Sequence, residues 1–306
     1  MNPTVSIVMA AKNYARFLPM AVESVRAQTF ADWELHIIDD GSTDDTREVV
    51  QRFLSDSRIH YLQLDALGQS RAKNLGIARS RGAFVAFLDA DDAWLPTKLE
   101  KQLALFQNGT GVVFCRRSLM DESGKTLPAK PQAAIPSGRV LTEMFKQNFV
   151  CFSSAMVRRE VFSRVGRFDP QWDLAIDYDL WLRVAKHYEF EFVDEELVHY
   201  RTGHGNLSKK LSDRVATAFS IMHRALNRFG IAPLPEVVAE GYASTCRTLG
   251  YVMRASEPET AAKCYWRAMQ WPHGRFASAK GLIASALVWL RGKRVVGAVE
   301  NATANV

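Results

Sequence analysis

Long apolar runs are missing from this chain of 306 residues. No stretch reaches the roughly 18 apolar residues needed to span a bilayer, which excludes a polytopic membrane protein. The first six residues lack a basic region followed by an apolar core, so they do not have the pattern of a secretory signal. We therefore expect a cytoplasmic protein, and the 47% hydrophobic content is typical of a globular one.

Cysteine is also scarce, and its spacing excludes two classes of small module. No Cys-x-x-Cys pair occurs, and no histidine lies at zinc-finger spacing from a cysteine. The pattern therefore indicates neither a disulfide framework nor a zinc ribbon. We expect buried free thiols in a reducing compartment. The four residues concerned are Cys115, Cys151, Cys246 and Cys264.

The net charge of +6 is unevenly distributed along the chain. Residues 209–306 hold 14 Lys and Arg against 6 Asp and Glu, whereas residues 1–208 hold 25 against 27. A basic segment can meet nucleic acid, an anionic bilayer or only solvent. We expect no nucleic-acid partner. The apolar run 281–290, flanked by Lys280 and Arg291, predicts either a helix lying on an anionic membrane or one packed against other helices or a second subunit.

Short apolar runs alternate with helical patterns through the first 108 residues. Strands are expected at 5–11, 34–38, 59–64 and 83–88, and helices at 17–28, 43–54 and 70–80. This alternation predicts an α/β fold with a doubly wound, mostly parallel sheet and ligands at the carboxyl ends of its strands. After residue 208 the pattern is wholly helical. The predicted domains are therefore 1–208, with halves 1–108 and 109–208, and a helical region 209–306.

Two predicted strands end in clusters of carboxylates. Asp39 and Asp40 follow one strand, and Gly41 permits a sharp turn after them. Asp89-Ala90-Asp91-Asp92 follows another, and three carboxylates so close together call for a cation. Hard divalent cations prefer oxygen ligands and keep open positions for phosphate oxygens. Either cluster could instead cap the helix that follows it.

Several motifs, in their order and spacing, closely resemble the family 2 glycosyltransferases of the GT-A fold. The matching segments are 5–8, 28–34, 39–44, 73–78 with Gly82, and the Asp-x-Asp metal motif 89–92. The resemblance covers roughly residues 4–208. It implies an inverting transfer of a sugar from a nucleotide diphosphate donor, for which we expect a UDP-sugar, with Mn²⁺ or Mg²⁺ as cofactor.

The resemblance also assigns roles to individual residues. Asp177 becomes the catalytic base, which an acceptor hydroxyl needs before it can attack the anomeric carbon. Asp91 and His204 become metal ligands, and Arg201 becomes a phosphate clamp. The expected donor-binding residues are Ala10, Lys12, Asp40, Lys73, Asp89, Ala90 and Arg201. A helix N-cap is the alternative role for Asp177, although Asp179 suits that role better.

The first loop departs from the family pattern, because Ala10-Ala11-Lys12-Asn13 stands where Pro-Thr-Tyr-Asn is common. The aromatic residue near the base is thereby replaced, and Lys12 could supply a phosphate contact instead. A nucleotidyltransferase should have a glycine-rich loop here, yet segment 10–16 contains no glycine. A catalytically inactive nucleotide-sugar-binding protein is the other alternative, and the retained Asp89, Asp91 and Asp177 argue against it. We expect a saccharide or lipid-linked saccharide acceptor, as in bacterial surface polysaccharide or glycolipid synthesis.

Overall fold

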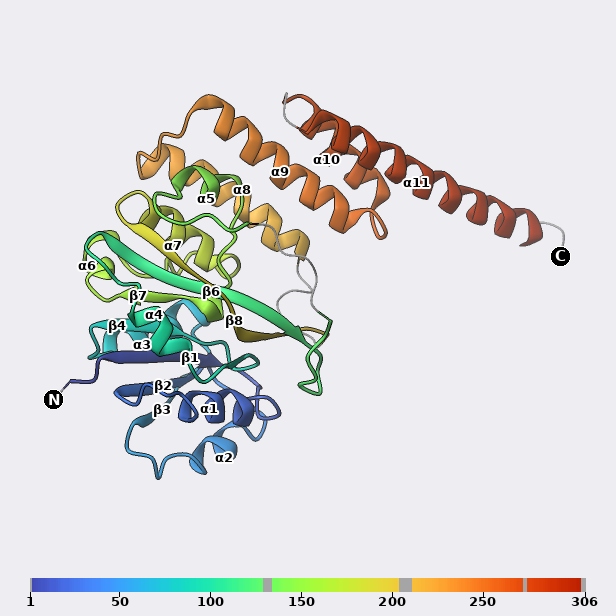
Figure 1. Cartoon of the computed structure of the whole chain (residues 1–306). Helices are drawn as coiled ribbons and strands as arrows, with labels where there is room; N and C mark the ends of the chain where they lie inside the picture. The colour runs from blue at the N-terminus through green and yellow to red at the C-terminus, as the bar shows by residue number, and fades with distance from the viewer. Residues whose placement is uncertain (1, 129–133, 204–210, 272–273, 304–306) are drawn as a thin grey trace. The chain divides into compact units, whose positions relative to one another are not determined.

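One eight-stranded mixed sheet organises the N-terminal two thirds of the chain. The computed structural model describes residues 2–128, 134–203, 211–271 and 274–303. The strand order is β3-β2-β1-β4-β7-β6-β8-β5, and Figure 1 shows β1, β2 and β3 side by side. The strands are β1 Val5–Ala11, β2 Trp33–Asp39, β3 Ile59–Gln63, β4 Phe84–Phe87, β5 Ala93–Trp94, β6 Thr110–Met120, β7 Met156–Arg158 and β8 Glu189–Arg201.

The first four neighbouring strands are all parallel, which confirms the predicted doubly wound sheet. β2 pairs with β3, β1 with β2, and β1 with β4, each in parallel register. The helices that connect and cover this sheet are α1 Leu18–Arg26, α2 Thr46–Gln51, α3 Gln69–Arg79, α4 Lys98–Leu103, α6 Val161–Val165 and α7 Ile176–Ala185. β7 runs antiparallel to both β4 and β6, whereas β6 and β8 are parallel.

Alternate residues of β1 explain how the sheet is held between helices. Ile7 and Met9 are fully buried in a core shared with Leu18 and Val22 of α1. On the opposite face, Val8 lies so close to Gly76 of α3 that a Cβ there would meet its Cγ1 at 2.5 Å. Glycine therefore permits α3 to approach the sheet closely. The carboxyl ends of β1, β2 and β4 consequently open towards the start of α3.

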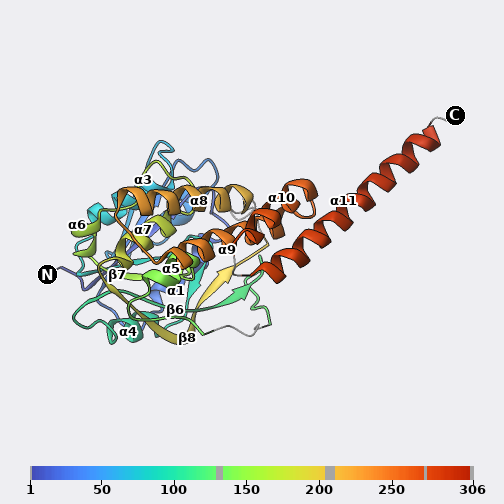
Figure 2. The same cartoon turned by 90° about the horizontal axis from the view of Figure 1, so that it is seen from above.

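The C-terminal helices form a second compact unit. It contains Thr142–Asn148 and residues from Asn206 onward, although the predicted boundary at 208 assigned the first of these segments to the N-terminal domain. Lys146 pairs with Glu240 at 2.6 Å within this unit. Its helices are α5 Leu141–Lys146, α8 Leu211–Arg228, α9 Pro235–Met253, α10 Pro258–Met269 and α11 Arg275–Thr303. Figure 2 shows α11 extending well beyond α10. Among the described residues, no helix has the length and apolar character needed to cross a membrane.

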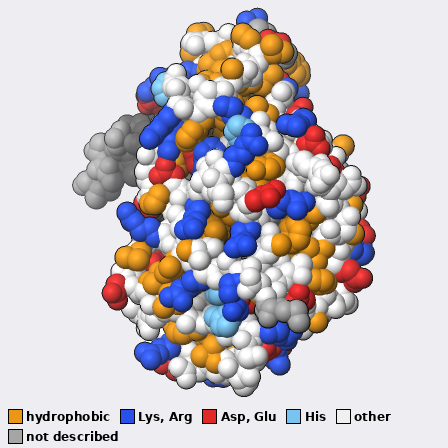
Figure 3. All heavy atoms as spheres, turned by 90° about the vertical axis from the view of Figure 1, so that its left-hand side faces the viewer, with side chains coloured by type: hydrophobic (Ala, Val, Ile, Leu, Met, Phe, Trp, Pro, Cys, Tyr) orange, Lys and Arg blue, Asp and Glu red, His pale blue; other side chains and the backbone are white. Residues whose placement is uncertain are grey.

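The surface carries charges of both signs. On the face seen in Figure 3, Lys and Arg side chains are dispersed among acidic and apolar ones. All four cysteines lie in described segments and are free thiols. Three of them are buried as expected, whereas Cys264 is half-buried.

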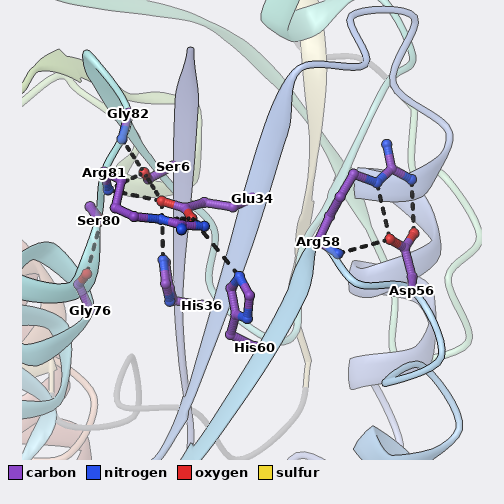
Figure 4. A network of polar contacts seen from close by, with 10 residues as sticks. All are labelled: Ser6, Glu34, His36, Asp56, Arg58, His60, Gly76, Ser80, Arg81 and Gly82. Carbon is purple, nitrogen blue, oxygen red and sulfur yellow. Dashed lines mark hydrogen bonds and ion pairs between the residues drawn. The ribbon is translucent and has the colours of Figure 1, made fainter. Parts of the chain in front are cut away.

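A buried polar network closes the amino-terminal ends of the strands. Glu34, only 2% exposed, accepts hydrogen bonds from Ser6 Oγ at 2.6 Å and from Arg81 Nη2 at 2.6 Å (Figure 4). His36 and His60 stack beside it with ring centroids 5.0 Å apart. Burial favours the neutral form of Glu34, but the bonds from Ser6 and Arg81 outweigh this and lower its pKa to about 2. The network therefore ties β1, β2 and the entry to β4 together at the end opposite the acidic turns.

Candidate active site

The acidic turn that follows β4 contains three carboxylates in different surroundings. The side chain of Asp89 is 33% exposed, whereas Asp91 and Asp92 are 7% and 1% exposed. Burial, followed by the charge of Asp89, raises the pKa of Asp91 to about 7. Burial likewise raises the pKa of Asp92 well above its ordinary value. Negative charge concentrated in this way would be relieved by a bound cation.

Lys73 of α3 faces this turn with a buried ammonium group. Its Nζ lies 3.0 Å from Asp89 Oδ1 and 3.4 Å from Gln69 Oε1, and it stands 3.9 Å from the centroid of the Phe152 ring. The lysine itself is 5% exposed. The Lys73 ammonium partly neutralises the three carboxylates, and its ion pair with Asp89 links α3 to the end of β4.

Arg201 lies behind the acidic turn. Its Nε donates to Asp91 O at 2.7 Å, and its Nη1 donates to the main-chain oxygens of Asp121 and Glu122 at 3.0 Å each. Its Nη2 donates to Met20 Sδ at 3.1 Å, and the residue is 2% exposed. The guanidinium therefore holds main-chain atoms, and its role as a phosphate clamp stays a prediction.

The turn after β2 is built around two differently bonded carboxylates. Asp39 accepts hydrogen bonds from Ser42 N at 2.8 Å and Tyr61 Oη at 2.7 Å. Asp40 accepts from the main-chain N–H groups of Leu67 at 2.6 Å and Gly68 at 3.1 Å. Asp40 thus anchors the entry to α3. Its carboxylate retains acceptor capacity, because each oxygen carries two lone pairs.

The first loop is fastened to this turn. Asn13, in the left-handed region at φ 60°, accepts Thr43 N on its side chain at 2.8 Å and donates its own N–H to Ser42 Oγ at 2.9 Å. Lys12 beside it is exposed. Asp44 accepts from the N–H of Thr46, the first residue of α2, whereas the N-cap position itself is Asp45, which makes no side-chain cap bond.

Asp177 lies in the first turn of α7 and is 6% exposed. The residue before this helix is Ala175, held in the left-handed region at φ 51° and ψ 30°. Asp179, predicted to be the N-cap, instead pairs with Arg183 Nη2 at 2.7 Å, so that prediction was wrong. Arg183 also donates to the main-chain oxygens of Val165 and Arg167. This buried pair fixes the loop that leads into α7.

Helix α3 brings the separate parts together. Its N-terminal residues bind the loop before α7, since Gln69 Nε2 donates to Asp173 O at 2.5 Å and Ser70 Oγ donates to Trp172 O at 2.8 Å. Asn74 adds a bond to Phe168 O at 2.7 Å. The same helix begins at the turn that Asp40 holds, and carries Lys73 to the acidic turn. One helix therefore contacts all three predicted segments of the site.

The other predicted site residues are placed as follows. Ala90 is 1% exposed and belongs to the hydrophobic core, so that only its main chain can face a ligand. Ala10 lies near the carboxyl end of β1, opposite Ile38. His204 lies outside the described residues. Sequence reasoning missed Ser153, whose hydroxyl contacts the acidic turn across 61 positions of the chain, because no local pattern marks it.

Comparison with known proteins identifies the class to which this fold and site belong. Residues 6–166 match the family described as Glycosyl transferase family 2. The chain is therefore a member of glycosyltransferase family 2. It is 34% identical over 206 residues to an uncharacterised glycosyltransferase of Nostoc sp. (strain PCC 7120), a match covering 64% of each chain. This chain thus spans about two thirds of the length of that relative.

A second relative and a solved structure are consistent with this membership. The chain is 31% identical over 211 residues to TuaG of Bacillus subtilis, provisionally named as a teichuronic acid biosynthesis glycosyltransferase, covering 68% of this chain and 82% of TuaG. The mannosyltransferase PcManGT of Pyrobaculum calidifontis, solved with GDP-Man and Mn²⁺, superposes with a TM-score of 0.57 at 18% identity. That match covers 94% of this chain and 87% of PcManGT. The fold is accordingly the GT-A fold.

Proposed function

We propose that this protein transfers a sugar from a nucleoside diphosphate donor to an acceptor hydroxyl, with inversion at the anomeric carbon. The observation that carries the proposal is the convergence on α3 of the Asp40 turn, the acidic turn and the loop before α7. The first two follow parallel strands, where open α/β sheets bind nucleotides. The third leads to Asp177, the one carboxylate that we assign to the chemistry itself.

Asp177 is the general base of this proposal. An acceptor hydroxyl becomes nucleophilic as its proton is removed, and a carboxylate in hydrogen-bond reach can accept that proton. The oxygen then attacks the anomeric carbon while the bond to the diphosphate breaks on the opposite side. Lys73, paired with Asp89, supplies positive charge beside the acidic turn and can reach a phosphate oxygen as a point charge. The product has the inverted configuration.

The acidic turn suits a divalent cation bound together with the donor. Among the described residues, no group of three or more His, Cys, Asp or Glu could by itself hold a metal ion. Asp91, with Asp89 nearby, can supply one or two carboxylate ligands, which is how Mg²⁺ is commonly held when phosphates complete its shell. Such an ion would neutralise charge developing on the leaving diphosphate. His204, predicted as a further ligand, lies outside the described residues.

A donor screen tests the proposed reaction. Purified protein is incubated with UDP-sugars, expected from the sequence, and with GDP-sugars, because PcManGT was solved with GDP-Man. Release of nucleoside diphosphate in Mn²⁺ or Mg²⁺, and its loss in EDTA, supports a metal-dependent transferase. Binding of a nucleotide sugar without release under any acceptor condition would favour the inactive binding protein instead. Proton NMR of the product then reports its anomeric configuration.

The metal role of Asp91 has its own test. Asp91→Ala should lower transfer by about 100-fold or more, because the diphosphate charge is left unneutralised as the bond breaks. Asp45→Ala is the matched control, since Asp45 is an exposed carboxylate at the start of α2. Initial rates across a Mn²⁺ titration provide the measurement. Full activity in Asp91→Ala, or in the parent with EDTA, would contradict the metal assignment.

We further propose a saccharide or lipid-linked saccharide acceptor presented at an anionic membrane surface. The name of TuaG, which provisionally assigns it to teichuronic acid biosynthesis, supports the acceptor class. Helix α11 supports the membrane contact, because its exposed side chains include Phe276, Ile283 and Leu287 at 76%, 61% and 52%. The exposed Lys280 lies among them, with its Nζ 4.6 Å from the centroid of the Phe276 ring. An apolar face bearing cations suits an interfacial helix.

A further inference from the structure

A three-residue 3-10 helix, η1 (Phe152–Ser154), lies directly behind the acidic turn. We propose that Ser153 is a positioning residue that holds this turn in the geometry required for metal and donor binding. The proposal rests on the proposed function and deepens it by assigning a support to the metal site. Ser153 comes from the half of the domain in which the sequence predicted no donor contact other than Arg201.

The hydroxyl of Ser153 bridges both ends of the acidic turn. It donates to Asp92 Oδ2 at 2.5 Å and accepts from the main-chain N–H of Asp89 at 3.1 Å. Because a serine hydroxyl has one donor and two acceptor positions, both bonds form at once. The turn is also closed internally, since Asp92 N donates to Asp89 O at 3.1 Å. With Ser153 fully buried, no solvent molecule competes for these bonds.

Asp92 is engaged on both of its carboxylate oxygens. Its Oδ2 accepts from Ser153, and its Oδ1 accepts from the main-chain N–H of Arg201 at 2.9 Å. Arg201 Nε in turn holds Asp91 O at 2.7 Å. Asp92 is therefore an anchor between η1 and β8. This arrangement fixes the main chain on either side of the Asp91 carboxylate.

The η1 segment is itself held by hydrogen bonds to neighbouring strands. Ser153 O accepts from Trp94 Nε1 at 2.7 Å, and Phe87 N of β4 donates to Ala155 O at 3.1 Å just beyond η1. The adjacent Phe152 ring carries Lys73 Nζ, the partner of Asp89. The η1 segment thus positions Asp89 in two ways, because Ser153 binds the main-chain N–H of Asp89 and Phe152 contacts Lys73, the counter-ion of Asp89. It positions Asp92 through the Asp92 carboxylate.

Removing the Ser153 hydroxyl should loosen the acidic turn without removing any of the proposed metal ligands. Partners that orient metal ligands from behind commonly change metal affinity by about 10- to 100-fold when they are replaced. We therefore expect Ser153→Ala to weaken Mn²⁺ binding in the presence of UDP by about tenfold. Ser154→Ala is the matched control. Ser154 is equally buried, but its hydroxyl donates to Cys151 O at 2.7 Å.

Isothermal titration of Mn²⁺ into each full-length protein with saturating UDP measures this affinity without turnover, and thermal unfolding of the same samples reports their folding. A tenfold loss in Ser153→Ala alone supports the positioning role. Equal affinity in Ser153→Ala and the parent overturns it, as does an equal loss in Ser154→Ala. If Ser153→Ala does not fold, Ser153→Cys, which keeps a weaker donor, should show a smaller loss in the same direction, and unchanged affinity there overturns the role. A parent that binds Mn²⁺ with neither UDP nor GDP overturns the metal-dependent function and the positioning role together.

Discussion

The carboxylates of this chain differ in the hydrogen bonds and ion pairs that they make with neighbouring protein groups. Asp92 has both oxygens bonded to protein groups, and Asp89 shares Oδ1 with a lysine. Asp40 holds two main-chain N–H groups at the start of α3. These different surroundings give chemically identical groups different structural roles. The mutational tests focus on Asp91 and Asp177 because the proposed function assigns metal binding and proton transfer to them.

Asp177→Asn should fold normally and bind donor, yet lose transfer by about 100-fold or more, because the amide keeps the shape but cannot accept the proton. Asp173→Asn, which changes an exposed carboxylate in the preceding loop, is the control. Single-turnover transfer and donor titration are measured separately. Persisting turnover with weakened donor affinity would mean that Asp177 is structural.

The lowered pKa of Glu34 predicts how the free energy of unfolding depends on pH. Its pKa is about 2 in the folded protein, below the ordinary value of 4.5, so its contribution is fully present above pH 4.5 and is lost as the pH falls towards 2. Glu34→Gln should therefore lower the free energy of unfolding at pH 7, and the difference from the parent should shrink below pH 4.5. Urea unfolding at pH 7, 5 and 3.5 measures it. A difference that stays constant across this range would show that the Glu34 charge contributes nothing.

His36 adds a second pH dependence to the same network. Burial lowers the pKa of His36, although Glu34 opposes this effect. The folded state therefore binds this proton less readily than the unfolded chain, and stability falls as the pH drops below 6.5. Comparing His36→Gln with the parent between pH 7 and 5 isolates this histidine effect, because Glu34 stays ionised over that range.

At the scale of elements, α3 and α7 carry the site on rigid supports. α3 contacts the loop before α7 through three side chains, and Arg183 of α7 donates to Arg167 O in the same loop. The junction is strained at Ala175, because a left-handed backbone brings Cβ close to the following carbonyl oxygen. Such strain persists only where surrounding contacts enforce it.

Ala175→Gly should increase the free energy of unfolding by about 1 kcal/mol, because glycine adopts this backbone without the Cβ penalty. The same exchange at Ala78, an exposed residue of α3 with ordinary helical geometry, should lower it by about 0.5–1 kcal/mol. Urea denaturation of both variants gives the two values. Destabilisation by Ala175→Gly comparable to that of Ala78→Gly would show that the turn is not strained.

On the scale of the whole molecule, the basic C-terminal unit differs from the nearly neutral domain that precedes it. Helix α11 packs its small residues inward. A Cβ at Gly281 would meet the Tyr265 ring at 2.1 Å, and Ser278 and Ser285 are fully buried. Phe276, Ile283 and Leu287 face outward instead. This inverted pattern favours an apolar or interfacial environment over water for the exposed face.

Vesicle sedimentation tests the membrane contact. The parent should bind anionic but not neutral vesicles, more weakly at high salt, because cations near such a surface contribute about 1 kcal/mol each. Ile283→Asp and Leu287→Asp should reduce binding. Leu54→Asp is the control, because Leu54 is a 39% exposed leucine of the N-terminal unit. Parent protein that ignores anionic vesicles at low salt, or variants that bind as well as the parent, would mean that α11 meets other protein instead.

Local sequence patterns determined the elements that carry the fold. The apolar run of β1 and the helical spacing in α1 and α3 predicted those elements to within two residues at each end, because hydrophobic periodicity reflects which faces are buried. The order of the motifs likewise predicted the family, which the match over residues 6–166 confirms. Short elements escaped prediction. β5, β7 and η1 have two or three residues each, too few to show any period.

Other features depend on contacts between segments that are far apart in the sequence. Strand β8 runs from Glu189 to Arg201, past register shifts against β6 that no periodic pattern foresees. Arg201 suits a phosphate clamp by residue type, yet folding brings main-chain oxygens from two other loops to its guanidinium. Ser153 has no sequence signature at all. The sequence by itself determined which carboxylates end the strands, whereas tertiary structure decided which of them are held by protein, because hydrogen-bond partners that are far apart in the chain meet only after folding.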